Sequence, residues 1–162
     1  MEKGFIICVD DEENVIKTLK EQLSYYFSET HEIEVALSGE EAWEIIQDIL
    51  REGGSVEVII TDQVMPGMKG SELLEKVHQI LPDTIKILLT GQAGLQDTIE
   101  AINKGGLNYF IEKPWEPEEL HLQVERLIKK YKENVENHRL IKKLEARVKE
   151  LEELLIEKVK EE

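Results

Sequence analysis

Five polar side chains stand at or just after the ends of short apolar runs in the first 115 residues: Asp10, Asp11, Asp62, Thr90 and Lys113. Three of them are carboxylates, one is a hydroxyl and one is an ammonium group. Crowded carboxylates repel one another unless a cation joins them, and hard oxygen ligands of this kind suit Mg²⁺. The lysine and the threonine could hold the oxygens of a phosphoryl group. If the fold brings these side chains together, the chemistry they favour is phosphoryl transfer, which depends on positioning and charge stabilisation.

The apolar runs that position these side chains are the predicted strands. They are Phe5–Val9, Val56–Thr61, Ile85–Leu89 and Leu107–Ile111, with a further alternating run at Ile33–Leu37 that is typical of an edge strand. Most of these runs are apolar at consecutive positions. Such strands need helices on both faces of a parallel sheet.

Segments with helical spacing of apolar residues separate and follow the strands. They are Glu12–Phe27, Ser38–Ile49, a segment around Leu73–Val77, Leu95–Lys104 and a long segment from Pro117 onward. Ser38 and Glu41 have the spacing of a capping box. The pattern predicts the α/β class, with a doubly wound (βα)5 parallel sheet. In such folds ligands bind at the carboxyl ends of the strands, where the five polar side chains would meet.

Each of these polar residues has an ordinary explanation when it is taken alone. Asp10 and Asp11 could be a helix N-cap with its neighbour. Asp62 is a common turn former, and Lys113 before a proline is common in turns. Their joint occurrence at the ends of the predicted strands favours a common site.

Four segments that contain these residues resemble the signature motifs of the receiver domains of two-component response regulators. They are Val9–Glu12, Asp62–Gly70, Leu89–Gly91 and Phe110–Trp115. The resemblance extends over about residues 4–128 and includes the order, the spacing and the strand context of the motifs. The Asp-Gln-x-Met-Pro-Gly-Met and Lys-Pro-Trp variants look most like receivers of HD-GYP phosphodiesterases or of NtrC-like regulators.

The resemblance implies a flavodoxin-like fold with strand order 2-1-3-4-5 and a phosphoacceptor at Asp62. Asp62 would accept the phosphoryl group from a phosphohistidine of a sensor histidine kinase. Asp11 would ligate Mg²⁺ directly and Asp10 through a water molecule, together with Asp62 and the backbone carbonyl of Val64. Such a domain is not an enzyme in the usual sense, because it catalyses only its own phosphorylation and dephosphorylation.

The same resemblance implies a conformational switch. Lys113 would pair with the phosphoryl group, the peptide bond between Lys113 and Pro114 would be cis, and Thr90 would turn its hydroxyl toward the phosphate. The switch aromatic of the family lies three residues before the lysine, which is Phe110 here. A hydroxyl therefore takes no part in this switch. The neighbouring Tyr109 is predicted to face outward from its strand.

Residues 116–162 are predicted to form one long helix, because they are rich in Glu, Lys and Leu and contain no Gly or Pro after Pro117. Part of this segment has the a/d spacing of a coiled coil, at Ile141, Leu144, Val148, Leu151 and Leu155. We therefore expect a receiver domain over residues 1–128 and a helical extension over residues 129–162 that forms a parallel dimeric coiled coil. The alternative is an amphipathic helix that folds back on its own domain.

The predicted partners follow from this organisation. The extension would hold a homodimer together or pass a signal to an output domain or protein. The face formed by the fourth helix, the fifth strand and the fifth helix is the second candidate for dimerisation, because the switch would change it.

The charge of the chain argues against direct nucleic-acid binding. The net charge is −15, and residues 116–162 hold 13 of the 35 acids and 11 of the 20 bases, so most of the negative charge lies in residues 1–115. Such a surface repels phosphate backbones. No apolar run approaches the roughly 20 residues of a membrane span, and the N-terminus lacks the pattern of a signal peptide. These features predict a cytoplasmic protein without membrane contact.

Several further residues are predicted to have only structural roles. Cys8 lies in an apolar run and is expected to be a small buried hydrophobe. Trp43 and Trp115 are expected to pack against the domain. The four histidines lack metal-ligand spacing and are expected on the solvated surface: His31, His78, His121 and His138.

Three other functions compete with the receiver interpretation. A phosphatase of the haloacid-dehalogenase kind needs a second Asp two residues after the first, and Val64 stands at that position. A flavodoxin-like cofactor binder needs a phosphate-binding loop after the first strand, where this chain has acids. The third alternative is a phosphorylation-independent coiled-coil scaffold or interaction module.

Overall fold

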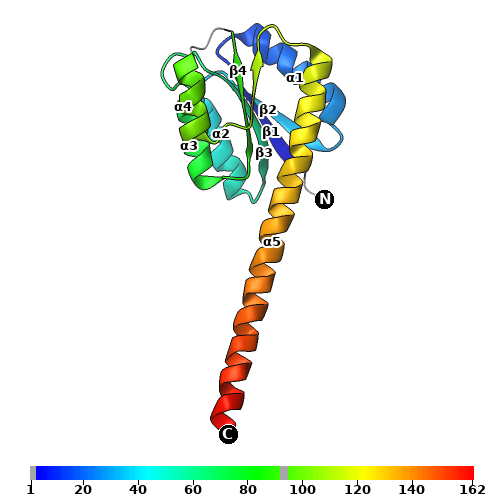
Figure 1. Ribbon diagram of the computed structural model, residues 1–162. Coiled ribbons are helices and arrows are strands. Elements are labelled where there is room, and N and C mark those ends of the chain that lie inside the picture. The colour runs from blue at the N-terminus through cyan, green and yellow to red at the C-terminus, as the bar shows by residue number, and fades with distance from the viewer. Residues whose placement is uncertain (1–2, 92–94) are drawn as a thin grey trace.

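The computed structural model describes residues 3–91 and 95–162, and its centre is one parallel five-stranded sheet (Figure 1). The strands are β1 (Gly4–Val9), β2 (His31–Ala36), β3 (Val56–Asp62), β4 (Ile85–Thr90) and β5 (Tyr109–Glu112). They lie in the order β2-β1-β3-β4-β5, and every neighbouring pair is parallel. The predicted α/β class and the strand order 2-1-3-4-5 are confirmed.

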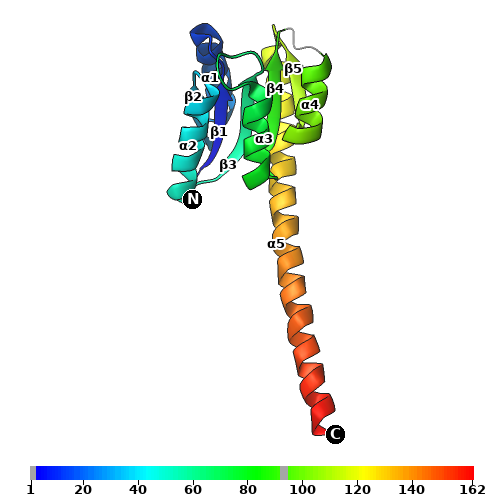
Figure 2. The ribbon, with the colours of Figure 1, turned by 90° about the vertical axis from the view of Figure 1, so that its left-hand side faces the viewer.

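Among the described residues, five helices follow the strands and cover both faces of the sheet (Figures 1 and 2). They are α1 (Glu13–Phe27), α2 (Gly39–Arg51), α3 (Gly70–Ile80), α4 (Leu95–Gly105) and α5 (Pro117–Glu161). Helices α1 and α5 contribute to the apolar core on one face, and α2 and α3 contribute to the core on the other. The consecutive apolar residues of β1, β3 and β4 are buried for this reason, since alternate side chains enter the two cores.

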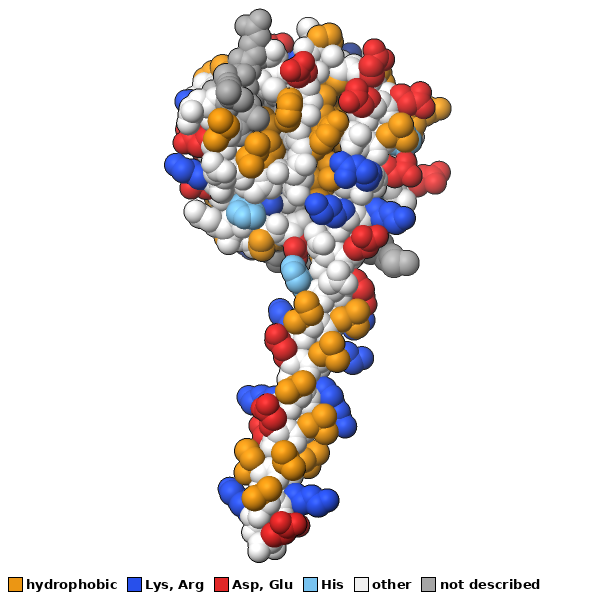
Figure 3. Space-filling view, in the orientation of Figure 1, with side chains coloured by type: hydrophobic (Ala, Val, Ile, Leu, Met, Phe, Trp, Pro, Cys, Tyr) orange, Lys and Arg blue, Asp and Glu red, His pale blue; other side chains and the backbone are white. Residues whose placement is uncertain are grey.

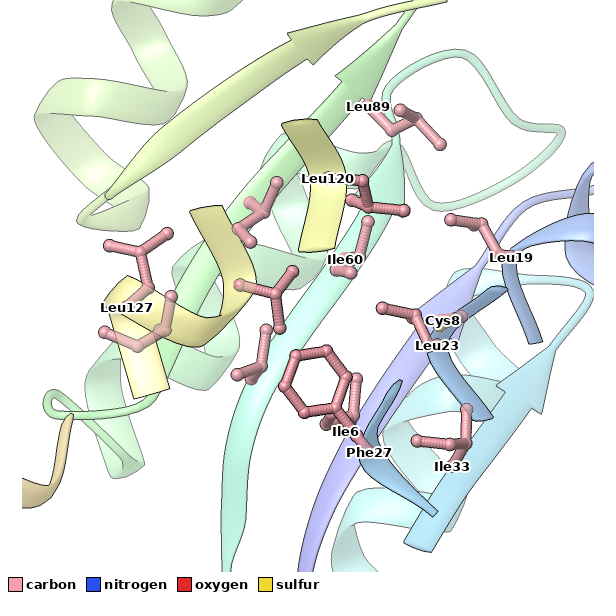
Figure 4. Close-up of a cluster of buried hydrophobic side chains, with 14 of the residues drawn as sticks. Ile6, Cys8, Leu19, Leu23, Phe27, Ile33, Ile60, Leu89, Leu120 and Leu127 are labelled. Carbon is pink, nitrogen blue, oxygen red and sulfur yellow. The ribbon is translucent and has the colours of Figure 1, made fainter. Parts of the chain in front are cut away.

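The core between the sheet, α1 and α5 fixes the position of the long helix (Figure 4). In this cluster Ile60 of β3 lies beside Leu120 of α5, whereas Ile6 and Cys8 of β1 lie beside Phe27 and Leu23 of α1. Burial raises the pKa of the Cys8 thiol to about 12, so this side chain behaves as the small hydrophobe that its apolar run predicts. The first three turns of α5 are therefore part of the domain.

Helix α2 shows how local sequence sets an element boundary. The Ser38 side chain accepts a hydrogen bond of 3.1 Å from the Glu41 backbone N–H. The Glu41 carboxylate accepts a bond of 3.2 Å from the Leu37 backbone N–H, one residue before the N-cap. The predicted capping pair is present, and it orders the turn that follows β2.

Helix α5 is continuous over 45 residues, and most of it lies outside the domain (Figures 1 and 2). Its buried residues are Leu120, Val124, Leu127 and Ile128, and the half-buried Tyr131 packs against the same core. Residues 135–162 are exposed throughout. The alternative in which the extension folds back on its own domain is therefore wrong. Among the residues described, no helix has the length and apolar character that a membrane span requires.

The prediction that all histidines are solvated is wrong for His31. Its side chain is 4% exposed, and its Nε2 lies 2.9 Å from Oε1 of Glu57, which is also buried. The ring is held from the other side by the Thr30 hydroxyl, 2.8 Å from Nδ1. An uncompensated carboxylate would be costly at this depth, and the imidazole supplies its partner.

The other histidines are at or near the surface. His121 is half-buried and stacks on Tyr26 with a centroid distance of 3.7 Å. His138 forms an ion pair with Asp83 in which Nδ1 and Oδ2 are 2.8 Å apart. Trp115 packs against the α1/α5 core, and its indole N–H donates a hydrogen bond of 2.7 Å to Gln22. Trp43 is likewise half-buried against the opposite core, which confirms the packing role predicted for both tryptophans.

Candidate functional site

The carboxyl ends of β1 and β3 bring three aspartates together. Val9 and Thr61 are paired across the two strands, so the residues that follow them, Asp10 and Asp62, lie side by side. One carboxylate oxygen each from Asp10, Asp11 and Asp62 lie within 4.8 Å of one another. Asp10 is fully buried, Asp62 is nearly so and Asp11 is exposed, so the cluster opens to solvent on one side.

Lys113 reaches this cluster from the segment that directly follows β5, an edge strand of the sheet. Its Nζ lies 2.7 Å from Oδ2 of Asp10 and 3.3 Å from Oδ1 of Asp62. The Lys113 backbone N–H donates a bond of 2.9 Å to the carbonyl of Thr90, which ties the segment after β5 to the end of β4. The peptide bond between Lys113 and Pro114 is cis, as the resemblance implies. Four of the five predicted site residues therefore form one connected group, and Thr90 joins it through its backbone.

The electrostatics of the cluster reflect competing effects on each group. Burial and the neighbouring charge of Asp10 raise the pKa of Asp62, although Lys113 acts in the opposite direction. Burial alone would lower the pKa of Lys113, but its hydrogen bond to Asp10 and the charges of Asp62 and Asp10 outweigh burial and raise that pKa. The lysine is thus held charged, and its charge only partly offsets the effects that raise the pKa of Asp62.

Asp10 is the most constrained member of the cluster. Its Oδ1 accepts a hydrogen bond of 2.9 Å from the backbone N–H of Glu12, and its Oδ2 accepts the bond from Lys113. The first bond is a turn that leads into α1, which begins at the next residue, Glu13. The N-cap of α1 is Glu12, so neither aspartate is the N-cap itself; Asp10 accepts the bond that orders the turn before the helix and contributes to the site as well.

The donor set of the cluster fits a hard divalent cation. All three candidate ligands are carboxylates, their closest oxygens can share one ion, and the exposed Asp11 leaves room for water in the coordination sphere. Mg²⁺ prefers oxygen ligands and retains several waters. Asp10, Asp11 and Asp62 are thus the residues that would hold Mg²⁺.

The remaining candidate residues lie around the cluster at different depths. Thr90 ends β4 and is buried, with 6% of its surface exposed. Val64 is 70% exposed in the loop between β3 and α3. Phe110 is 47% exposed on β5, whereas Tyr109 is half-buried against the α1/α5 core. The prediction that Tyr109 faces outward is therefore wrong, and Phe110 has the exposed position.

Two residues at this site have no counterpart in the predicted set. Gln63 follows Asp62 directly and is 1% exposed. Its Oε1 accepts a bond of 2.8 Å from the backbone N–H of Ser71, and its Nε2 donates one of 3.1 Å to the Ser71 hydroxyl. The Gly70 N–H also donates a bond of 3.1 Å to the Gln63 carbonyl. These three bonds, which we call the Gln63–Ser71 clamp, hold the start of α3 against the residue next to the phosphoacceptor candidate.

Gly70 is required at the same place for a steric reason. A Cβ atom on this residue would collide with the backbone carbonyl oxygen of Asp62. The motif spacing marks Gly70 as part of the loop. It does not reveal that the loop returns to Asp62, since that closure depends on three-dimensional contacts.

Comparison with known proteins identifies one family. The model for "Response regulator receiver domain" matches residues 6–125. The chemotaxis protein CheY homolog of Campylobacter jejuni is 32% identical over 125 residues, which are 76% of this chain and 91% of that protein. The hydrogenase transcriptional regulatory protein HoxA of Bradyrhizobium diazoefficiens is 29% identical over 144 residues, which are 89% of this chain and 26% of HoxA.

Solved structures show the same likeness. The signal receiver domain of an HD domain-containing protein from Pseudomonas fluorescens superposes with a TM-score of 0.72 at 27% identity, and the match covers 82% of this chain and 99% of that domain. This match and the regulatory relatives agree with the predicted likeness to receivers of HD-type and NtrC-like proteins. The chain spans between about a quarter and a half of the length of the first curated relatives that it matches.

Proposed function

Because this chain belongs to the response regulator receiver domain family, we propose that it accepts a phosphoryl group on Asp62 from a phosphohistidine of a sensor histidine kinase. The observation that carries the proposal is the position of Lys113, whose Nζ contacts both Asp10 and Asp62 beside a three-carboxylate cluster. A carboxylate nucleophile, a cation-binding pair and a fixed ammonium group are the parts that phosphoryl transfer requires.

The roles of the residues follow from their positions. An oxygen of Asp62 attacks phosphorus, the P–N bond to the kinase histidine breaks, and an acyl phosphate forms. Asp10 and Asp11, with Asp62 and the Val64 carbonyl, would hold Mg²⁺, which neutralises charge on the phosphoryl oxygens when it is bound. Lys113 lies 3.3 Å from the attacking carboxylate and can pair with the phosphoryl group without leaving its place.

The response to phosphorylation would pass through two residues beyond the cluster. Thr90 turns its hydroxyl toward the phosphoryl group, and Phe110, which is 47% exposed, moves inward. Both changes alter the face formed by α4, β5 and α5. Since α5 continues out of the domain as one helix, residues 1–128 act as the receiver and residues 129–162 carry the change to a second copy or to an output domain or protein.

The test is intact-mass spectrometry of the whole chain after incubation with Mg²⁺ and acetyl phosphate. The wild type should gain the mass of one phosphoryl group, and Asp62→Asn should gain none. Asp48→Asn is the matched control, because it makes the same chemical change at an exposed position on α2. Uptake of label by Asp62→Asn, or no uptake by the wild type together with undetectable Mg²⁺ binding, would contradict the proposal.

A further inference from the structure

The extended part of α5 carries a stripe of large apolar side chains that have no contact with the domain. The stripe consists of Ile141, Leu144, Val148, Leu151 and Leu155, which are between 48% and 64% exposed. Figure 3 shows hydrophobic side chains along the helix below the domain. A contiguous apolar surface on a protruding helix is typical of an interaction site. The residue types and charges along the stripe indicate which partner covers it.

The residue types along the stripe favour a two-stranded parallel coiled coil. In heptad notation Ile141, Val148 and Leu155 occupy position a, and Leu144 and Leu151 occupy position d. Two of the three residues at position a are β-branched and both at position d are leucine. This combination favours parallel dimers over trimers and tetramers, because β-branched side chains pack well at a and leucine packs well at d in that geometry.

The stripe faces away from the domain to which the helix belongs. Helix α5 packs on its own domain through Leu120, Val124, Leu127, Ile128 and Tyr131. Successive helical residues are about 100° apart, so the centre of the stripe lies about 120° around the axis from this packed side. A second helix can therefore lie along the stripe without meeting the domain that the first helix carries.

The charges beside the stripe distinguish parallel from antiparallel pairing. Glu145 and Glu152 occupy position e, and Arg147 occupies position g. In a parallel dimer each g residue faces the e residue of the following heptad on the other helix, so Arg147 meets Glu152 of the second copy. In an antiparallel dimer e faces e, and Glu145 would meet Glu152 with the same charge.

The present partner of Arg147 does not compete strongly with this arrangement. Arg147 pairs with Glu150 on its own helix at 3.0 Å, and both side chains are about 60% exposed. Exposed pairs of this kind contribute little to stability. Arg147 can therefore turn to the second helix at small cost.

The residues near the domain indicate where the coiled coil begins. When the heptad pattern is extended toward the N-terminus, Asn134 occupies position a and Asn137 occupies position d. The preceding a position is Leu127, which is buried in its own domain. A polar residue at position a fixes the register of a coiled coil. The two helices can therefore pair from Asn134 onward, and they must separate before Leu127.

We propose that residues 134–159 pair with the same segment of a second copy of this chain as a parallel, in-register two-stranded coiled coil, oriented by the pair of Arg147 and Glu152 of the second copy. This specifies the partner of the helix in the proposed function. Its geometry does not depend on phosphorylation. A negative result without a phosphoryl donor would therefore count against the coiled coil alone. A negative result in the mass-spectrometry test would count against phosphorylation of Asp62 alone.

The first test is sedimentation equilibrium of the full chain and three charge variants. Glu152→Arg and Arg147→Glu should each raise the dimer dissociation constant roughly tenfold, since two attractive pairs become repulsive. An equimolar mixture of the two variants should recover the wild-type constant, because each Arg then meets a Glu. Glu153→Arg is the matched control: it lies at position f, on the far side of the helix, and should change nothing.

The signs of these changes can overturn the proposal. Antiparallel helices would make Glu152→Arg strengthen the dimer, because it would remove the contact with Glu145. A chain that stays monomeric at all concentrations would refute pairing with a second copy. A dimer that persists in the Leu144→Asp, Leu151→Asp double variant would place the contact on the receiver domain.

Disulfide crosslinking tests the register separately. Asn137→Cys should form an interchain disulfide under mild oxidation, because the two copies of a d position face each other only in a parallel, in-register pair. Lys149→Cys, at an outward position, should not crosslink. The native Cys8 is fully buried and does not interfere. Equal crosslinking of both variants would contradict the proposed register.

Discussion

Replacing Gln63 with leucine should weaken Mg²⁺ binding without removing any metal ligand. The Gln63–Ser71 clamp holds the start of α3 against the residue that lies between Asp62 and Val64. Gln63→Leu has a similar volume and keeps the backbone bond from Gly70, but it removes both side-chain bonds. Of the three bonds of the clamp, the loop that carries Val64 then keeps only the backbone bond to α3.

The magnitude follows from what the substitution leaves buried. Ser71 is 7% exposed, and its N–H and hydroxyl would both lose their partners. A buried polar group without a partner costs about 1–3 kcal/mol, so the free energy of unfolding should fall by about 2–3 kcal/mol. Groups that orient metal ligands typically change metal affinity by about 10–100-fold, and we expect about a tenfold rise in the Mg²⁺ dissociation constant.

Isothermal titration calorimetry with Mg²⁺ and urea unfolding would measure the two effects. Thr84→Val is the matched control, because the Thr84 hydroxyl donates a buried bond of 2.7 Å to the Val56 carbonyl at the opposite end of the sheet. It should lower stability by a comparable amount and leave Mg²⁺ affinity unchanged. If Gln63→Leu loses stability but binds Mg²⁺ like the wild type, the clamp does not position the site.

Three further perturbations test other contacts. His31→Leu leaves the buried Glu57 carboxylate without its partner, and urea unfolding should show a loss of about 3–5 kcal/mol; the double variant that also carries Glu57→Leu should recover most of it, and no recovery would mean that the pair is not the cause. Burial lowers the pKa of Lys86 from 10.5 to about 8, so between these values the unfolded chain binds more protons and stability should rise with pH, by up to about 3 kcal/mol. Unfolding measured at pH 7.5 and 9.5 should show about 2 kcal/mol of this rise in the wild type and none in Lys86→Met; the same slope in both would assign it to another group. Gly70→Ala should cost about 1–3 kcal/mol by overpacking and slow labelling by acetyl phosphate, because its Cβ would meet the Asp62 carbonyl oxygen; an unchanged labelling rate would show that the loop adapts.

The parts of the site that sequence alone predicts are those fixed by strand ends. Asp10 follows a strand whose residues are all buried or nearly so, and the same holds for Thr90 at the end of β4. A continuous apolar strand is stable only where both faces of the sheet are covered, and the residue after it must lie at the carboxyl end of the strands. The position of each polar side chain then follows from the order of the strands, without knowledge of any loop.

Contacts between distant segments could not be predicted in this way. His31 and Glu57 are 26 residues apart and belong to strands that are not neighbours in the sheet. Histidine and glutamate side chains are usually found at the surface, so only the contact between these two explains their burial. The Gln63–Ser71 clamp was missed for a related reason, since polar residues flanking a Pro/Gly-rich loop are usually solvated.

The error at Tyr109 has a different cause. Strand β5 is only four residues long, and a shift of one position exchanges the two faces of a strand. Two aromatic residues in succession satisfy either choice. The structure resolves it because Tyr109 packs beside α5 and its hydroxyl lies 3.5 Å from Glu119. A short strand needs such a neighbour before its faces can be assigned.

In the proposed mechanism, the packed turns of α5 couple the two ends of the molecule. The proposed phosphoacceptor site lies at the carboxyl ends of the strands, whereas α5 leaves the domain past their amino ends, where His138 pairs with Asp83 just before β4. The roughly 30 residues beyond Tyr131 extend about 45 Å, so a tilt of about 5° at the domain would move the far end by about 4 Å. A helix without a partner would simply move with such a tilt. In the proposed dimer, two helices joined in register cannot separate by that amount, so a change at the domain would instead alter how the two receivers face each other.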